Sequence, residues 1–398
     1  MAGSRQSNRF LLLYALAWAG GSVAYVPFLT ILLPVKVSLL AGAGGEVTWL
    51  AYIAFAGAIA ASLGHIGFGY LSDITGNRRG WIWLGLIVSC CLLVAVTRAT
   101  GLVSMIAIVL AWQLGLNMML APLSAWAGDS VPHSQKGLLG GLLAFAPGCG
   151  ALAGAFVTIP GLAPADGRLW LVALIVAACV VPVLTIGSPE PVEEPVPSPE
   201  KTVVPEHPDG LLDRNGAKQR MWLARLAVQV AEAALFSYLY FWFRSIDPAM
   251  SDSRTARILS VVLVLSAPVA VWTGQWADRH RRPVVPLIVC SALSCVGLMG
   301  MAFAQSLPAA IGAYALFGLA TSIFLALHSA QTLRVLTRSD RRGRDLGVFN
   351  LTNTVPSLFM PWLTLALVPR FGFSGLLLVL SALAAVAGLL LVSFPRRT

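Results

Sequence analysis

Long apolar runs alternate with short polar turns along the chain. Each run is close to the ~20 residues that a helix needs to cross the hydrocarbon core of a bilayer, and the turns between runs hold Gly, Pro and Arg. The sequence therefore predicts an all-α membrane protein with twelve transmembrane helices, at residues 10–34, 47–71, 81–99, 102–128, 137–160, 169–187, 219–246, 254–276, 284–304, 308–335, 344–368 and 373–394.

The composition agrees with this pattern. Of the 398 residues, 57% are hydrophobic and 11% are charged, and the mean hydropathy is +0.79. Soluble domains carry about 25% charged residues. A large soluble protein with many buried helices would still need a polar surface, and this chain lacks the residues for one. We expect an integral membrane protein that contacts the lipid bilayer.

The net charge of +10 comes from basic residues in the turns. If the N-terminus is inside, most Lys and Arg fall on the cytoplasmic side, which is the usual asymmetry of membrane proteins. We expect both termini in the cytoplasm of a bacterial-type inner (plasma) membrane. Nucleic-acid binding is not expected, because no basic patch is interleaved with aromatic residues. The first apolar run continues to Pro34, too long for a signal-peptide core, and predicts a span.

Two turn motifs recur in the two halves of the chain. The turn after the second helix reads GYLSDITGNRR (69–79) in one half and GQWADRHRR (274–282) in the other. The fifth helix of the first half opens with KGLLGG (136–141), and the fifth helix of the second half opens with RGRDLG (342–347). The repeats predict an N-terminal six-helix bundle at 1–187 and a C-terminal six-helix bundle at 219–398. A cytoplasmic Pro/Glu-rich linker at 188–218 would join them as a spacer, with regulatory docking as the alternative.

The first of these turns resembles the loop signature of the major facilitator superfamily, Gly-x-Leu-small-Asp-x-x-Gly-x-Arg/Lys-Arg/Lys. The resemblance implies two pseudo-symmetric bundles that rock around a site near the middle of the membrane. It also implies that the motif latches the cytoplasmic side against helix eleven, near Arg344 and Asp345, while the outside is open; a role in topology alone is the alternative. The gating motif comprises Gly69, Asp73, Gly76, Arg78 and Arg79, with a degenerate copy at Gly274, Asp278, Arg281 and Arg282.

Within the superfamily, two turns are similar to those of cation-coupled sugar symporters and sucrose-type carriers. They read APLSAWAGDSVPHSQKG (121–137) and DRRGRDLGVFNLTNTVP (340–356). Multidrug/proton antiporters usually carry an Arg in helix four and Gly-Pro-x-x-Gly-Gly in helix five. Here helix four has no Arg, and helix five offers only Ala-Pro-Gly-Cys-Gly at 146–150. The resemblance favours a symporter-like importer over an exporter.

Glu232 is the acidic residue that falls within an apolar span. It lies about thirteen residues into its helix, or ~20 Å along it, near the bilayer midplane. Arg225 and Gln229 share its face by i, i+4, i+7 spacing. Ionisable groups inside a membrane mark functional sites. We expect Glu232 to be the coupling carboxylate, protonated in one access state and ionised in the other. A structural role held by Arg225, or direct substrate binding, are the alternatives.

Other polar side chains share helix faces, and the resemblance implies that helices one, four, seven and ten line a central cavity. Such a cavity suits a neutral polar solute such as a sugar, although hydrogen bonds between helices are the alternative. We count His328 with the ion-coupling residues and interpret His65, among small residues, as a packing residue. The expected substrate-binding residues are Tyr25, Gln113, Asn117, Thr321, Phe324, Gln331, Asn350 and Asn353.

The sequence offers no paired carboxylates, Ser-His-Asp set, phosphate loop or metal-ligand spacing, and its six Cys lie in apolar runs. We expect no enzyme activity, no cofactor and no metal. The expected function is secondary active transport of a small polar solute, with sugars favoured, by a monomer coupled to protons or sodium. The alternatives are proton-driven efflux of drugs or sugars, and a non-transporting assembly factor of the same fold.

Overall fold

The computed structural model describes residues 5–42, 44–132, 135–190, 211–335 and 342–392, without the side chains of 136–137, 211–215, 217–218 and 330–351. Throughout these residues the regular elements are helical. They are α1 (Asn8–Pro27), the π-helical turn η1 (Phe28–Leu32), α2 (Leu33–Leu40), α3 (Glu46–Thr75), α4 (Arg78–Ala95), the 3-10 turn η2 (Val96–Arg98), α5 (Leu102–Ser130), α6 (Lys136–Leu143), α7 (Ala146–Val157), α8 (Ala165–Ile186), α9 (Leu211–Ile246), α10 (Asp252–Arg279), α11 (Val285–Phe303), α12 (Leu307–Val335) and α13 (Arg342–Val392).

The predicted fold class, with its twelve transmembrane helices, is confirmed. Eleven helical stretches of the described chain are long and apolar enough to cross a membrane, and the last of them, Thr352–Val392, has 41 residues. A straight helix of that length would measure ~60 Å, about twice the hydrocarbon core. It is broken at Gly372, whose φ of 65° and ψ of −175° belong to a region that essentially only glycine occupies. The stretch therefore supplies two spans.

Three boundaries differ from the sequence prediction. The fifth span is divided into α6 and α7, because Pro147 lacks an N–H and its ring clashes with the carbonyl four residues earlier. That carbonyl belongs to Leu143, where α6 ends. The first span runs on through η1 to Leu40, past the predicted end at residue 34. Helix α9 begins at Leu211, inside the predicted linker.

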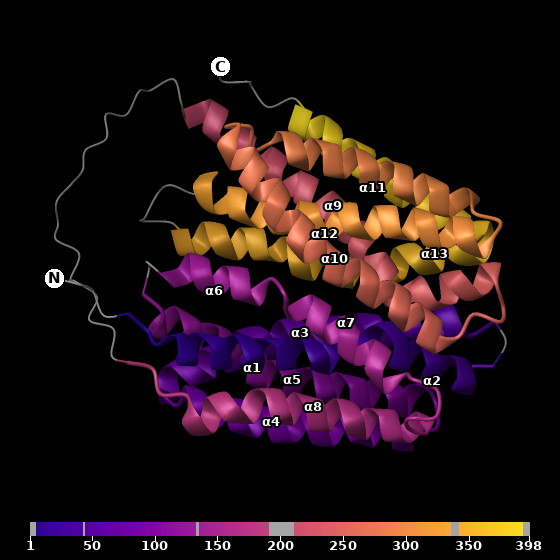
Figure 1. Ribbon diagram of the computed structural model, residues 1–398. Coiled ribbons are helices and arrows are strands. Elements are labelled where there is room, and N and C mark those ends of the chain that lie inside the picture. The colour runs from indigo at the N-terminus through magenta and orange to yellow at the C-terminus, as the bar shows by residue number, and fades with distance from the viewer. Residues whose placement is uncertain (1–4, 43, 133–134, 191–210, 336–341, 393–398) are drawn as a thin grey trace.

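The helices form two bundles, with α1–α8 in one and α9–α13 in the other (Figure 1). The third and fourth spans of each bundle cross at a glycine. A Cβ on Gly85 of α4 would overlap the backbone nitrogen of Met119 in α5, and a Cβ on Gly297 of α11 would overlap that of Phe317 in α12. Small residues let membrane helices pack backbone to backbone. The same close crossing thus occurs in both halves.

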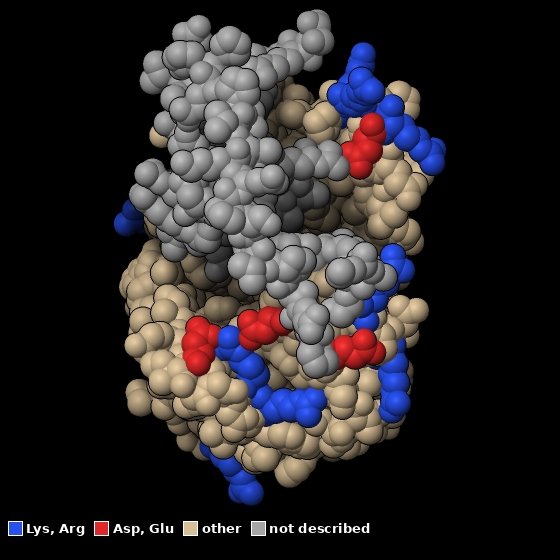
Figure 2. Space-filling view, turned by 90° about the vertical axis from the view of Figure 1, so that its left-hand side faces the viewer, with Lys and Arg blue, Asp and Glu red and all other residues tan. Residues whose placement is uncertain are grey.

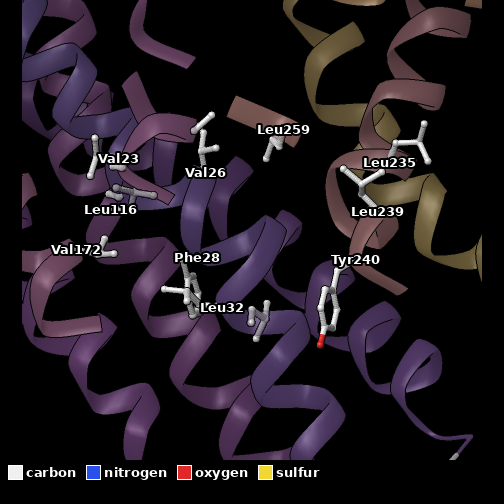
Figure 3. Close-up of a cluster of buried hydrophobic side chains, with 14 of the residues drawn as sticks. Val23, Val26, Phe28, Leu32, Leu116, Val172, Leu235, Leu239, Tyr240 and Leu259 are labelled. Atoms are coloured by element: carbon white, nitrogen blue, oxygen red, sulfur yellow. The ribbon is translucent and has the colours of Figure 1, made fainter. Parts of the chain in front are cut away.

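We call the two ends of the molecule the terminal end and the opposite end. At the terminal end, on the left of Figure 1, α1 begins and α13 finishes. Figure 2 looks onto this end and shows basic and acidic side chains gathered there. The apolar core extends through both bundles, from Val26 and Phe28 of the first span to Leu235 and Leu239 of α9 (Figure 3).

The segment before α1 is fixed to the rest of the terminal end by Gln6. Its backbone N–H donates to Gln135 Oε1 at 2.7 Å, and Gln135 Nε2 donates to the Gln6 carbonyl at 3.0 Å. The Gln6 side chain makes the same kind of pair with the backbone of Glu190, at 2.6 and 2.9 Å. Gln6 therefore joins the start of the chain to the α5–α6 turn and to the segment after α8.

Candidate functional site

A cavity of about 810 Å³ lies between the two bundles. Binding pockets for small molecules measure ~300–1,000 Å³. The first span, α3 and α5 supply one wall, and α9 and α13 supply the other. Because both bundles contribute, a relative movement of the bundles would change the shape of this site and its access.

The cavity is closed toward the opposite end. Along α3, the lining residues Leu50 and Ile53 near that end are 1% and 0% exposed, whereas Ile66 near the terminal end is 73% exposed. The Trp362 ring of α13 packs edge-on against Tyr52 and Phe55 of α3, with ring centroids 6.3 and 5.1 Å apart. Aromatic contacts thus join α3 to α13 beside the cavity, although none of these three rings lines it.

Glu232 of α9 lines the cavity and is the carboxylate among the described residues that do so. Its Oε2 accepts a hydrogen bond from Gln229 Nε2 at 3.2 Å. Tyr25 of the first span lies across from it, with its ring 6.2 Å from that of Phe236, one turn after Glu232. The same described lining contains neither Lys nor Arg. The site is therefore a mixed apolar and amide surface around one acid.

Arg225 shares a helix with Glu232 but is directed elsewhere. Its Nη1 donates to Ser329 Oγ at 2.8 Å and to the Leu325 carbonyl at 3.5 Å, and its Nη2 donates to Asn353 Oδ1 at 3.2 Å. Among the described side chains, no ion pair joins Arg225 to Glu232. The alternative in which Arg225 holds Glu232 by an ion pair does not fit this conformation, because α12 and α13 offer the guanidinium nearer partners.

Gln113 and Asn117 of α5 line the cavity, and so does His65 of α3. Asn117 Nδ2 donates to the Gln113 carbonyl at 2.9 Å, and Asn117 Oδ1 lies 3.2 Å from His65 Nδ1. The interpretation of His65 as a packing residue is corrected. Small residues next to it, including Ala61 and Ser62, also face the cavity. Gly64, directly before His65, packs closely on Leu114 and Asn117 of α5, so the helix contact expected in this stretch is present beside the cavity.

The expected contribution of α12 is corrected as well. Thr321 is buried, with its Oγ1 3.0 Å from Ser294 Oγ of α11, and Phe324 is fully buried in the core. His328 is 0% exposed, and its Nε2 donates to the Met221 carbonyl at 2.9 Å. This helix face is turned into its own bundle. Helical spacing identifies which residues share a face, but not what that face contacts. The side chains of Gln331 and Asn350 lie outside the described residues.

Polar residues of α13 take the place expected for α12. Asn353, Thr354 and Ser357 line the cavity, together with Ser237 of α9. The shared face of Asn353, Thr354 and Ser357 is visible in the sequence, whereas nothing in the sequence pointed to Ser237.

The gating motif forms a compact cluster within the first bundle. Arg78 pairs with Asp73 at 2.5 Å and with Asp129 of α5 at 3.0 Å. Arg79 instead donates to the Gly187 carbonyl and lies 5.2 Å from the Trp126 ring. A Cβ on Gly69 would meet Ala121 of α5, at 4.0 Å. In this conformation Gly69 thus contacts its own bundle, and Arg344 and Asp345 lie outside the described side chains.

The degenerate copy keeps the backbone of the first turn. Gly76 has φ 61°, and Arg281 at the equivalent position has φ 52°. Gly76 N donates to the Asp73 carbonyl at 3.3 Å, and Arg281 N donates to the Asp278 carbonyl at 3.3 Å. Gly274 lies against Leu327 of α12, and Arg282 N donates to the Ala277 carbonyl. The left-handed turn is therefore retained although its glycine is not.

The Major Facilitator Superfamily model matches residues 222–398. The fold is similar to a bacterial homolog of the human lysosomal transporter Spinster in its inward-facing, unoccupied conformation, at 14% identity and a TM-score of 0.64, over 97% of this chain and 92% of that one. The occupied, inward-facing form of the same bacterial homolog is 14% identical, with a TM-score of 0.67, over 96% of this chain and 94% of that one. The fold is also similar to that of the human organic anion transporter MFSD10 (TETRAN), at 15% identity and a TM-score of 0.65, over 96% of this chain and 98% of that one. No curated protein sequence matches this chain.

Proposed function

We propose that this chain, whose residues 222–398 match the Major Facilitator Superfamily model and whose fold is similar to that of transporters, is a member of that superfamily and carries a small polar solute across the membrane by alternating access. The observation that supports this most directly is Glu232. It is an acidic side chain in a cavity between two bundles, with no cation among the described lining residues. An assembly factor of the same fold would not need such a group.

Glu232 is the proposed coupling group, and a proton is the favoured ion. Sodium sites in transporters use unwound backbone carbonyls, but α9 is helical from Leu211 to Ile246. A carboxyl group that exchanges a proton between access states fits this site. Since the cavity lies within one chain, the proposed transport unit is a monomer.

We assign the terminal end to the cytoplasm, because the basic turns gather there. The described conformation is then open to the inside. The amides of Gln113, Asn117 and Gln229 support a hydroxyl-rich solute such as a sugar, taken up with protons. A second candidate is proton-driven efflux of an amphipathic solute, because apolar residues such as Leu29, Ile53 and Phe236 also line the cavity.

The test is flux into proteoliposomes with a panel of labelled sugars, polyols and amphipathic organic cations, under imposed pH or sodium gradients. We expect the wild type to accumulate at least one panel solute with the pH gradient. Glu232→Gln should still exchange that solute across the membrane but should not accumulate it. Glu46→Gln, at the opposite end and outside the cavity, is the matched control. Gradient-driven accumulation by Glu232→Gln equal to that of the wild type would refute the coupling role.

A further inference from the structure

His65 differs from a packing histidine in its surroundings. Its side chain is exposed to the cavity, and its Nδ1 lies 3.2 Å from Asn117 Oδ1. The neighbouring Ser62 uses its hydroxyl on the Ala58 carbonyl of the same helix, at 2.9 Å. His328, by contrast, is fully buried and bonded to a carbonyl. His65 and His328, both within spans, therefore differ in their surroundings.

The hydrogen bonds of Asn117 determine the tautomer of His65. The atom of Asn117 that lies 2.9 Å from the Gln113 carbonyl must be the NH₂ group, because a carbonyl oxygen only accepts. The amide oxygen of Asn117 consequently faces His65, and that oxygen only accepts as well. His65 Nδ1 must then carry the hydrogen. In the neutral imidazole this leaves the lone pair on Nε2, which makes no hydrogen bond with the described residues.

We propose that His65 is a solute-binding residue, whose Nε2 accepts a hydrogen bond from a hydroxyl or ammonium group of the transported solute. This inference rests on the proposed function and deepens it. Glu232, on the wall formed by the other bundle, is a second acceptor in the same cavity. Each wall of the cavity thus presents a hydrogen-bond acceptor to the solute, His65 on one side and Glu232 on the other. The matching substrate class has hydrogen-bond donors on two sides, as polyols and sugars do.

Anionic solutes fit this arrangement poorly. Carboxylates and phosphates need donors, preferably Arg or Lys, and the described lining residues include neither. Asn117 would act on the solute through His65, whereas the side-chain amide of Gln113 lines the cavity itself. Asn117 fixes the imidazole, and the Gln113 carbonyl fixes Asn117. Asn117 is therefore a positioning residue in this proposal, and His65 is the residue that touches the solute.

The first test is independent of transport. Full-length protein with ¹⁵N-labelled histidine is placed in lipid nanodiscs at pH 8, and the signal absent from His65→Gln is assigned to His65. We expect a neutral imidazole with the hydrogen on Nδ1 and none on Nε2. Asn117→Leu should lose this preference, because the acceptor that selects the tautomer is gone. A hydrogen on Nε2 in the wild type would overturn the proposal.

The second test measures specificity with the panel solutes that the wild type carries. His65→Phe should raise KM about tenfold, as the loss of one hydrogen bond of ~1.4 kcal/mol would. It should also lose discrimination between a solute and its deoxy or O-methyl analogue. His65→Gln, whose amide oxygen accepts, should retain part of both. Tyr70→Phe is the matched control, because Tyr70 lies on the same helix, is exposed and is outside the cavity lining, and it should leave KM and discrimination unchanged.

The outcomes separate the two proposals. If His65→Phe keeps the wild-type KM and discrimination for every carried solute, His65 does not bind solute. If the wild type carries no panel solute, the proposed function fails, and the tautomer in the spectrum still decides whether His65 can act as the acceptor.

Discussion

Arg168 of α8 and Asp252 of α10 form an ion pair that joins the two bundles at the opposite end. The two side chains are only 16% and 19% exposed. Asp252 is also the first residue of α10, where the helix dipole favours a carboxylate. If the opposite end opens during transport, this pair has to separate. It therefore stabilises the conformation described here.

Reversal of either charge should favour opening of the opposite end. Arg168→Asp or Asp252→Arg leaves two like charges facing each other, and we expect a loss of about 1–3 kcal/mol from the closed conformation. The measurement is labelling of an Ala54→Cys reporter in the cavity by an impermeant thiol reagent added from the opposite side. The double swap Arg168→Asp/Asp252→Arg should restore low labelling. If the double swap labels like the single variants, the pair does not hold this end closed.

Trp362→Ala should raise labelling of the same reporter. The variant removes the ring contacts with Tyr52 and Phe55, each worth ~0.5–1.5 kcal/mol, and opens space between α3 and α13. Trp272→Ala on α10 is the control, because that ring is exposed on the outer surface of its bundle. Equal labelling in the two variants would show that Trp362 does not close the cavity.

Asp73→Asn should shift the population toward the conformation that is open at the terminal end. In that conformation Arg78 keeps Asp129 as its partner. The ion pair between Arg78 and Asp73 that the variant removes is exposed and is worth only ~0–1 kcal/mol, so this conformation loses little stability. The expected latch of the other conformation loses its carboxylate altogether. Reporter labelling from the opposite side should fall relative to the wild type. Unchanged labelling would argue against the latch.

Arg281→Gly should stabilise the protein. The φ of 52° at Arg281 costs a non-glycine residue ~1–2 kcal/mol, and part of this gain is offset by the chain entropy of glycine. We expect a net gain of about 0.5–1 kcal/mol, seen as a higher midpoint of thermal unfolding in nanodiscs. Arg282→Gly removes the same charge at a residue without positive φ, and should lower the midpoint. A fall of equal size in both variants would contradict the strain at Arg281.

The sequence was sufficient for the spans and the turn, because these depend on local properties. Apolar length sets the helices, and Gly76 permits the left-handed φ of its turn. Glu232 was identifiable because an acid in an apolar run is costly. The roles of His65 and Phe324 were not accessible in this way. Each lies on a helix whose rotation about its axis is set by contacts with distant helices, and helical periodicity does not contain that information.

The pairing of Gln6 with Gln135 and Glu190 has a practical consequence. Truncation of the chain past Gln6 would remove hydrogen bonds from two other segments at once. An affinity tag placed directly before this residue would compete for the same space. A short spacer between the tag and Gln6 would leave this anchoring intact, so the design of the N-terminus becomes a variable in any preparation of this protein.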